Sequence, residues 1–138
     1  MSGIRASSAP APVGAYPHAR RVGSLLFLSG VGPRRPGDGQ VPGNILDDHG
    51  AVVGYDFEAQ CQQVFANVRA VLEASGASLK QLVDVTVFLT DMAGDFATFN
   101  RLYAEAFAGI DACRTTVGVS ALPTPIAIEF KCIAALKG

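Results

Sequence analysis

Two ionisable side chains near the end of the chain have the types needed to handle a small organic acid. Arg114 opens the alternating segment RTTVGVS, and Glu129 interrupts the apolar stretch from Ile126 to Ala134. An arginine guanidinium is a planar fork that can bind one carboxylate through two hydrogen bonds, and Gly118, without a side chain, would leave room for a ligand. The simpler alternative is a surface arginine at the end of a strand.

Glu129 and Asn100 each allow a structural and a chemical interpretation. In a strand, Glu129 would point away from its apolar neighbours. It is then either an ordinary exposed carboxylate or, if that face meets another copy of the chain, a partly desolvated one that can orient a water molecule. Asn100 lies at the rim of an apolar helical stripe, where it either satisfies nearby backbone groups or contacts a ligand.

Further candidates lie nearer the start of the chain. Arg34 and Arg35 are adjacent in a loop rich in proline and glycine, where they are either solvated or form a second clamp for an anion. His18 is the one histidine that could act as a general acid or base, because His49 sits in the turn-like DDHG. Neither histidine has metal-ligand spacing and the three cysteines lie far apart, so we expect no metal site and no disulfide framework.

Length and composition indicate one globular domain. The chain has 138 residues, of which 49% are hydrophobic and 17% charged, enough apolar material for a packed core. Residues 1–13, rich in proline, alanine and serine, are expected to form a flexible arm ahead of a domain spanning residues 14–138. The net charge of −1 argues against a nucleic-acid partner. No segment resembles a membrane span or a signal peptide, so a reduced, cytoplasmic location is expected.

Apolar periodicity predicts the elements that would position these residues. Helices are expected over residues 55–75 and 95–107, where apolar side chains recur on one face. Strands are expected over residues 20–29, 82–90, 114–120 and 126–134, with a short one near 51–53. This order predicts an α+β domain in which two helices cover one face of a mixed sheet.

The sheet face without helices is predicted to be an interface. Along segment 82–90, one face would carry Val83, Val85, Val87 and Leu89. The helix-free face would carry Phe88 and part of Leu25–Leu28 beside small polar residues, namely Thr86, Thr116 and Ser120. Such a face is too apolar for water and too polar for a closed core. We therefore expect sheets to pack together in a homo-oligomer with polar pockets between subunits.

The stretch that runs from Arg114 through Thr-Thr-Val-Gly-Val and Leu-Pro to Glu129 resembles the signature of the RidA/YjgF enamine/imine deaminase family. Leu28-Ser-Gly30 and the segment Asp95–Tyr103 resemble it too, and the similarity spans nearly the whole chain. The resemblance implies a chorismate-mutase-like fold and a homotrimer, alone or as a pair of trimers. In that trimer the sheets face inward as a barrel and the sites lie in clefts between subunits. It also implies a hydrolase that needs no metal or organic cofactor.

The resemblance also implies roles for particular residues. Arg114 would bind the carboxylate of a small-molecule substrate and Glu129 would position the hydrolytic water. The family's pocket would further be lined by Tyr16, Gly30 and Asn100, together with His18 and Thr116.

One branch of the family is more similar than the rest. The Tyr16-Pro-His18 segment, the Arg34-Arg35 loop and Arg114-Thr-Thr look like the 2-aminomuconate deaminases, whose dicarboxylate enamine arises in the breakdown of aromatic compounds. Thr116 stands where many other members have cysteine, and the loop before Arg114 is short. In this branch Arg114 would hold the carboxylate next to the nitrogen-bearing carbon, and Arg34 or Arg35 the distal one.

Three alternative functions remain within the family. They are a generic 2-imino acid deaminase, an endoribonuclease and a non-catalytic metabolite-binding protein. The near-zero net charge and the absence of tryptophan argue against an RNA-binding surface.

Overall fold

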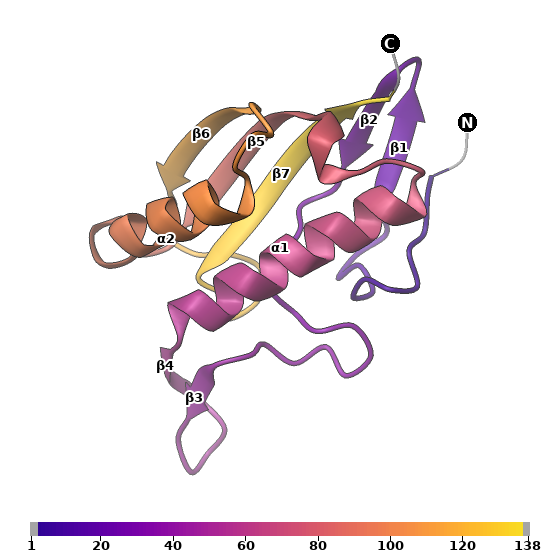
Figure 1. Ribbon diagram of the computed structural model, residues 1–138. Helices are drawn as coiled ribbons and strands as arrows, with labels where there is room; N and C mark the ends of the chain where they lie inside the picture. Colours follow the sequence, from indigo (N-terminus) through magenta and orange to yellow (C-terminus); the bar gives the residue numbers. More distant parts are fainter. Residues whose placement is uncertain (1–2, 137–138) are drawn as a thin grey trace.

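The centre of the fold is a five-stranded mixed sheet (Figure 1). The computed structural model describes residues 3–136. The strands lie in the order β1-β2-β7-β5-β6, and all neighbours are antiparallel except β5 and β6. Their bounds are β1 Ala19–Val22, β2 Leu25–Leu28, β5 Leu82–Leu89, β6 Cys113–Gly118 and β7 Ile128–Ala135. The expected single strand over residues 20–29 is in fact the hairpin β1–β2, because Gly23 adopts a positive φ of 61° and turns the chain.

Two helices, α1 (Phe57–Ala74) and α2 (Met92–Ala106), cover one face of this sheet, as predicted (Figure 1). Helix α1 ends within two residues of its expected bounds, 55 and 75, because its end signals are local. Asp56 caps the first turn by accepting the Ala59 N–H at 3.2 Å, and Gly76 follows the helix with a φ of 77°. A short 3₁₀ turn, η1 (Leu79–Gln81), leads into β5.

Helix α2 begins three residues before the position that the sequence predicts. Asp91 accepts a hydrogen bond from the Gly94 N–H at 3.1 Å and so caps the helix ahead of its first apolar residues. A Cβ atom at position 94 would collide with the Asp91 carboxylate. The apolar stripe starts only at Phe96, so periodicity alone placed the start too late.

Strand β5 confirms the predicted alternation except at its start. Val85, Val87 and Leu89 are buried beneath the helices, whereas Phe88 faces the helix-free side and is half-buried. The position predicted for Val83 is wrong, because the register shifts between Leu82 and Asp84 and leaves Val83 41% exposed.

The parallel pairing of β6 with β5 corrects the expected face of Thr116. Thr116 pairs with Val87 and Arg114 with Val85, so both point to the helix-covered face rather than to the helix-free face with Thr86. The sequence gives the alternation within each strand but not the register between them.

The remaining strands form a separate hairpin, β3 (Asn44–Leu46) with β4 (Val52–Tyr55), which projects beyond the N-terminal end of α1 (Figure 1). The short strand expected near residues 51–53 corresponds to β4, whereas β3 was not predicted. Tyr55 anchors the hairpin by donating a hydrogen bond to Asp95 in the first turn of α2, at 2.6 Å.

The segment ahead of residue 14 packs against the domain over the part that the structure describes. Ile4 pairs with Ala19, and Ala6 and Ala9 are buried. The flexibility expected of residues 1–13 stays a prediction, but the boundary at residue 14 does not coincide with a break in packing. Among the described residues, no helix combines the length and the apolar character needed to cross a bilayer.

Candidate active site

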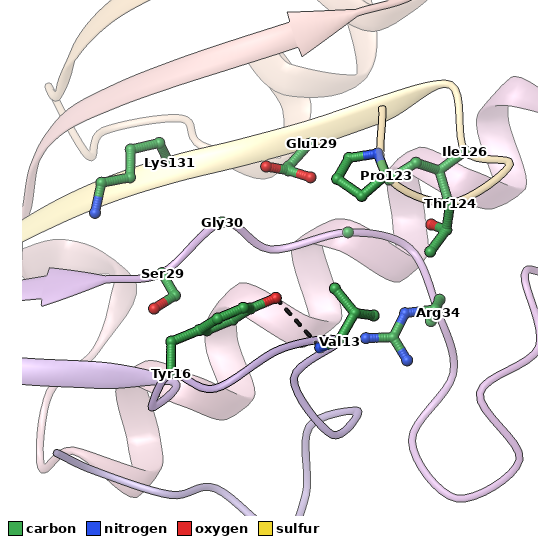
Figure 2. A pocket seen from close by; sticks show the side chains of 11 residues that line it. Val13, Tyr16, Ser29, Gly30, Arg34, Pro123, Thr124, Ile126, Glu129 and Lys131 are labelled. Carbon is green, nitrogen blue, oxygen red and sulfur yellow. Dashed lines mark hydrogen bonds between the residues drawn. The ribbon is translucent and has the colours of Figure 1, made fainter. Parts of the chain in front are cut away.

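A cleft of about 350 Å³ opens on the helix-free face of the sheet, beside the start of β7 (Figure 2). One wall is the loop that follows β2 and the other is the loop that precedes β7. Its polar lining consists of Tyr16, Ser29, Arg34, Thr124, Glu129 and Lys131.

Glu129 lies between these walls and against the backbone of Gly30. A Cβ atom at position 30 would collide with the Glu129 carboxylate, so only glycine allows this approach. The Glu129 side chain is half-buried, and burial raises its pKa above the usual value. A raised pKa makes the carboxylate a stronger base, better able to accept a proton from a bound water molecule.

Tyr16 and Arg34 connect the cleft to the N-terminal segment. The Tyr16 hydroxyl accepts a hydrogen bond from the Val13 N–H at 3.2 Å (Figure 2). The Arg34 guanidinium donates to the Ala11 carbonyl at 2.7 Å. Arg35 does not line this cleft and instead forms an exposed ion pair with Asp38 at 3.5 Å.

His18 lies beside the cleft rather than in it. Its Nδ1 accepts the Ala6 N–H at 2.9 Å, and its Nε2 lies 2.7 Å from the Pro10 carbonyl, to which it donates in the neutral tautomer that the first bond requires. Both ring nitrogens are therefore engaged with the N-terminal segment, which supports a structural role over acid–base chemistry.

Two buried amides on α1 hold the walls of the cleft, and the sequence analysis missed both. Asn67 donates to the carbonyls of Gly32 and Arg34 at 2.9 and 2.8 Å. Gln60 accepts the Ala127 N–H at 2.8 Å and so fixes the chain just before Glu129. The sequence does indicate such residues, because both amides lie inside the apolar stripe of the helix. A buried amide at such a position needs hydrogen-bond partners from another element.

A second cluster of functional side chains surrounds Arg114 on the helix-covered face. The guanidinium donates to Asn100 Oδ1 at 2.9 Å and lies over the rings of Phe99 and Tyr103, at 5.0 and 4.8 Å from their centres. These contacts hold the fork in one orientation, unlike a freely solvated surface arginine. They also show that Asn100 serves Arg114 rather than the backbone. Thr116 lies on the same side of β6, and its buried hydroxyl has no hydrogen-bond partner among the described residues.

The two clusters cannot act on one small molecule within a single chain. Arg114 on β6 pairs with Val85 of β5, and Glu129 on β7 pairs with Phe88 of β5. The two residues therefore lie on strands at opposite sides of β5. Two strand spacings and a three-residue offset place their Cα atoms roughly 14 Å apart, and the odd offset turns the side chains to opposite faces. We call these clusters the arginine half-site (Arg114, Asn100, Phe99, Tyr103 and Thr116) and the glutamate half-site (the cleft around Glu129).

Neither half-site has the ligands of a metal centre. Within residues 3–136, no group of histidine, cysteine, aspartate or glutamate side chains could hold a metal ion. Cys61 and Cys132 are buried and Cys113 is exposed, and none is in a disulfide. The chemistry at hand is that of a guanidinium, a carboxylate and small hydroxyl groups.

The structure is thus an α+β chain with two helices on one sheet face and a cleft containing a carboxylate on the other. The family model described as Endoribonuclease L-PSP matches residues 6–136, so the chain belongs to this family, the RidA/YjgF proteins. A RutC family protein of Pyrococcus horikoshii is 39% identical over 131 residues, covering 95% of this chain and 94% of the relative.

Two further proteins are similar to this chain, one in sequence and one in both sequence and structure. The chloroplastic Reactive Intermediate Deaminase A of Arabidopsis thaliana is 38% identical over 133 residues, covering 96% of this chain and 65% of the relative. The crystal structure of the yjgF gene product of E. coli superposes with a TM-score of 0.83 at 33% identity, covering 99% of this chain and all of the other. The mixed α+β fold predicted from the sequence is confirmed by this match.

Proposed function

We propose that the protein is a cofactor-independent deaminase that hydrolyses an enamine or imine to a 2-oxo acid and ammonia. It works as a homotrimer, in which the arginine half-site of one subunit completes the glutamate half-site of the next. The observation that carries this proposal is the pairing of a preorganised carboxylate-binding fork with a desolvated carboxylate, on opposite faces of one sheet. Only a second copy of the chain can bring such groups to one ligand.

The proposed reaction assigns one task to each half-site. Arg114, held by Asn100, binds the substrate carboxylate through two hydrogen bonds and so fixes the adjacent carbon. The enamine first becomes the imine by a net shift of one proton from nitrogen to the neighbouring carbon. Water beside Glu129 then adds to the C=N carbon while Glu129 accepts a proton from the water and returns it to nitrogen. The resulting carbinolamine passes its hydroxyl proton to the amine through Glu129, so that ammonia leaves as the C=O bond forms. Such acid–base assistance typically contributes 10²–10⁴-fold.

For the substrate we propose 2-aminomuconate, an intermediate of aromatic-compound breakdown, in the cytoplasm. Its two carboxylates suit a site with more cations than Arg114 alone, and Arg34, unlike Arg35, lines the cleft. A generic 2-imino acid is the second candidate, favoured by the Reactive Intermediate Deaminase A of Arabidopsis thaliana among the relatives.

Mixing two inactive variants tests the shared site. Arg114→Ala and Glu129→Gln should each lower ammonia release from 2-aminomuconate, measured above a no-enzyme control, by about 10²-fold or more. Co-refolded at equal amounts, they should regain about one quarter of the wild-type sites, because some interfaces receive both intact halves. Mixed trimers without activity, or a monomeric mass in light scattering, would overturn the proposal. Ammonia release also separates deamination from endoribonuclease activity and from binding alone.

A further inference from the structure

Lys131 is a charged residue of the cleft to which the proposed reaction gives no role. It follows Glu129 by two residues on β7 and points to the same helix-free face. Its ammonium group donates a hydrogen bond to the carbonyl of Leu28 and lies 6.0 Å from the centre of the Phe27 ring. Both partners are uncharged, so they orient the lysine without neutralising it.

The cleft therefore carries positive charge that the described chain does not balance. Within residues 3–136, neither Lys131 nor Arg34 forms an ion pair, and Arg34 donates only to a backbone carbonyl. Glu129 forms no ion pair with Lys131 or Arg34 among the described residues, and burial raises its pKa, so its charge does not offset theirs. Two unpaired cations beside one such carboxylate favour an anionic ligand.

The spacing along β7 matches a short dicarboxylate. Positions two residues apart on a strand are about 6.6 Å apart along the backbone. If Glu129 lies beside the nitrogen-bearing carbon, position 131 is therefore offset from it by about the length of a short carbon chain. Lysine has three N–H donors and uses one on Leu28, which leaves two for a carboxylate. Figure 2 shows Lys131 and Arg34 at opposite ends of the cleft with Glu129 between them.

We infer that Lys131 binds the distal carboxylate of a dicarboxylate substrate and thereby determines specificity for dianions. This assignment rests on the proposed function, because it concerns the far end of the same substrate. It makes Lys131, on a strand of the central sheet, the principal partner of that carboxylate in place of Arg34, on a loop. A strand position holds a charge at a more constant distance from Glu129 than a loop position does.

Kinetics on two substrates test the inference. Lys131→Met keeps the apolar stem but removes the charge. We expect its KM for 2-aminomuconate to rise about 10- to 100-fold, because a hydrogen bond to a charged group is lost, with a much smaller change in kcat. For a monocarboxylic 2-imino acid generated in situ, the loss in kcat/KM should be at least tenfold smaller. Lys131→Arg should restore most of the preference.

Two further variants complete the kinetic test. Lys80→Met removes an exposed lysine on η1, outside both half-sites, and should leave both substrates unaffected. Arg34→Met is the competing variant. If it shows the selective loss and Lys131→Met does not, the distal carboxylate lies at Arg34 and the inference is overturned. Equal losses on both substrates in Lys131→Met would overturn it as well.

A binding measurement separates this inference from the proposed function. cis,cis-Muconate carries two carboxylates but no nitrogen, so it binds without reacting. Calorimetry should show affinity for muconate falling about 10- to 100-fold in Lys131→Met and unchanged in Lys80→Met. A wild-type protein that releases no ammonia but shows this pattern would refute deamination and keep the subsite. Equal affinity of wild type and Lys131→Met would refute the subsite alone.

Discussion

The two half-sites are built by different means. In the arginine half-site, side chains hold a side chain: Asn100 and two aromatic rings fix the Arg114 guanidinium against α2. In the glutamate half-site, side chains hold the backbone instead. Glu129 lies against the backbone of Gly30, between two loops. Gln60 accepts an N–H of one loop, and Asn67 donates to a carbonyl of the other. Arg114, which is proposed to bind the substrate, is therefore fixed by direct contacts with other side chains. Glu129, which is proposed to react, instead has its position and its pKa set by the backbone and the burial around it.

The largest effect is expected from Arg114→Ala, which empties the arginine half-site. Loss of two charge-assisted hydrogen bonds should lower kcat/KM by about 10²–10⁴-fold. The melting temperature should change little, since Arg114 is half-buried on an edge strand. Steady-state ammonia release and circular dichroism measure the two. Activity close to that of wild type would mean that this half-site does not bind the substrate.

Glu129→Gln should affect the glutamate half-site almost as strongly, through kcat rather than KM. General-base assistance of about 10²-fold or more is lost. In the wild type, the acidic limb of the pH–rate profile should lie above the usual glutamate range, because activity falls as Glu129 is protonated and burial raises its pKa. A limb at the ordinary value, or one that persists in the variant, would assign it to another group.

The same substitution should stabilise the protein at neutral pH. Because the folded pKa of Glu129 is raised, its ionised form is disfavoured in the folded state, so the cost appears as pH rises above the unfolded pKa. Glu129→Gln should therefore melt higher than wild type at pH 7 and equally at pH 3. A lower melting temperature at pH 7 would contradict the desolvation described for the cleft.

Gly30→Ala tests whether the backbone positions the carboxylate. The added Cβ displaces Glu129, and a shift of about 1 Å at a reacting group can cost 10²-fold in rate. We expect a fall in kcat of up to about that size, with the fold retained. Gly23→Ala, in the remote β1–β2 turn, is the control for general glycine strain, because its φ is positive but no atom lies within 4 Å. An equal loss in the control would remove the argument for position 30.

Asn67→Leu should loosen one wall of the cleft while leaving the arginine half-site intact. Two loop carbonyls lose their partner, which destabilises the protein by about 1–3 kcal/mol. Gln63→Ala removes only the side chain that donates to Asn67 and should cost less. Urea denaturation gives both values. A larger cost for Gln63→Ala would mean that the loop does not depend on Asn67.

The smallest effect is expected from Thr116→Val. The variant removes a buried hydroxyl that has no partner among the described residues, so stability should rise by up to about 1 kcal/mol. A rise in KM beside this gain would identify the hydroxyl as a ligand contact of the arginine half-site. A loss of stability would instead indicate a partner within the chain.

Local signals explain which parts could be predicted from sequence. Asp56 and Gly76 mark the ends of α1 in the chain itself, and the alternation from Val85 to Leu89 gives the buried face of β5. Thr116 and Val83 were misplaced because their orientation depends on pairing with another strand. The Arg114–Asn100 hydrogen bond joins β6 to α2, and no pattern in the neighbouring residues predicts a contact between those two elements.

Truncation of the N-terminal segment would alter the cleft. The sequence predicts a flexible arm here, yet Ala6 and Ala9 lie inside the hydrophobic core and the Ala11 carbonyl accepts a hydrogen bond from the guanidinium of Arg34. Without these residues, the imidazole of His18 would lose both of its hydrogen-bond partners. Arg34, in a wall of the cleft, would lose its hydrogen bond to Ala11.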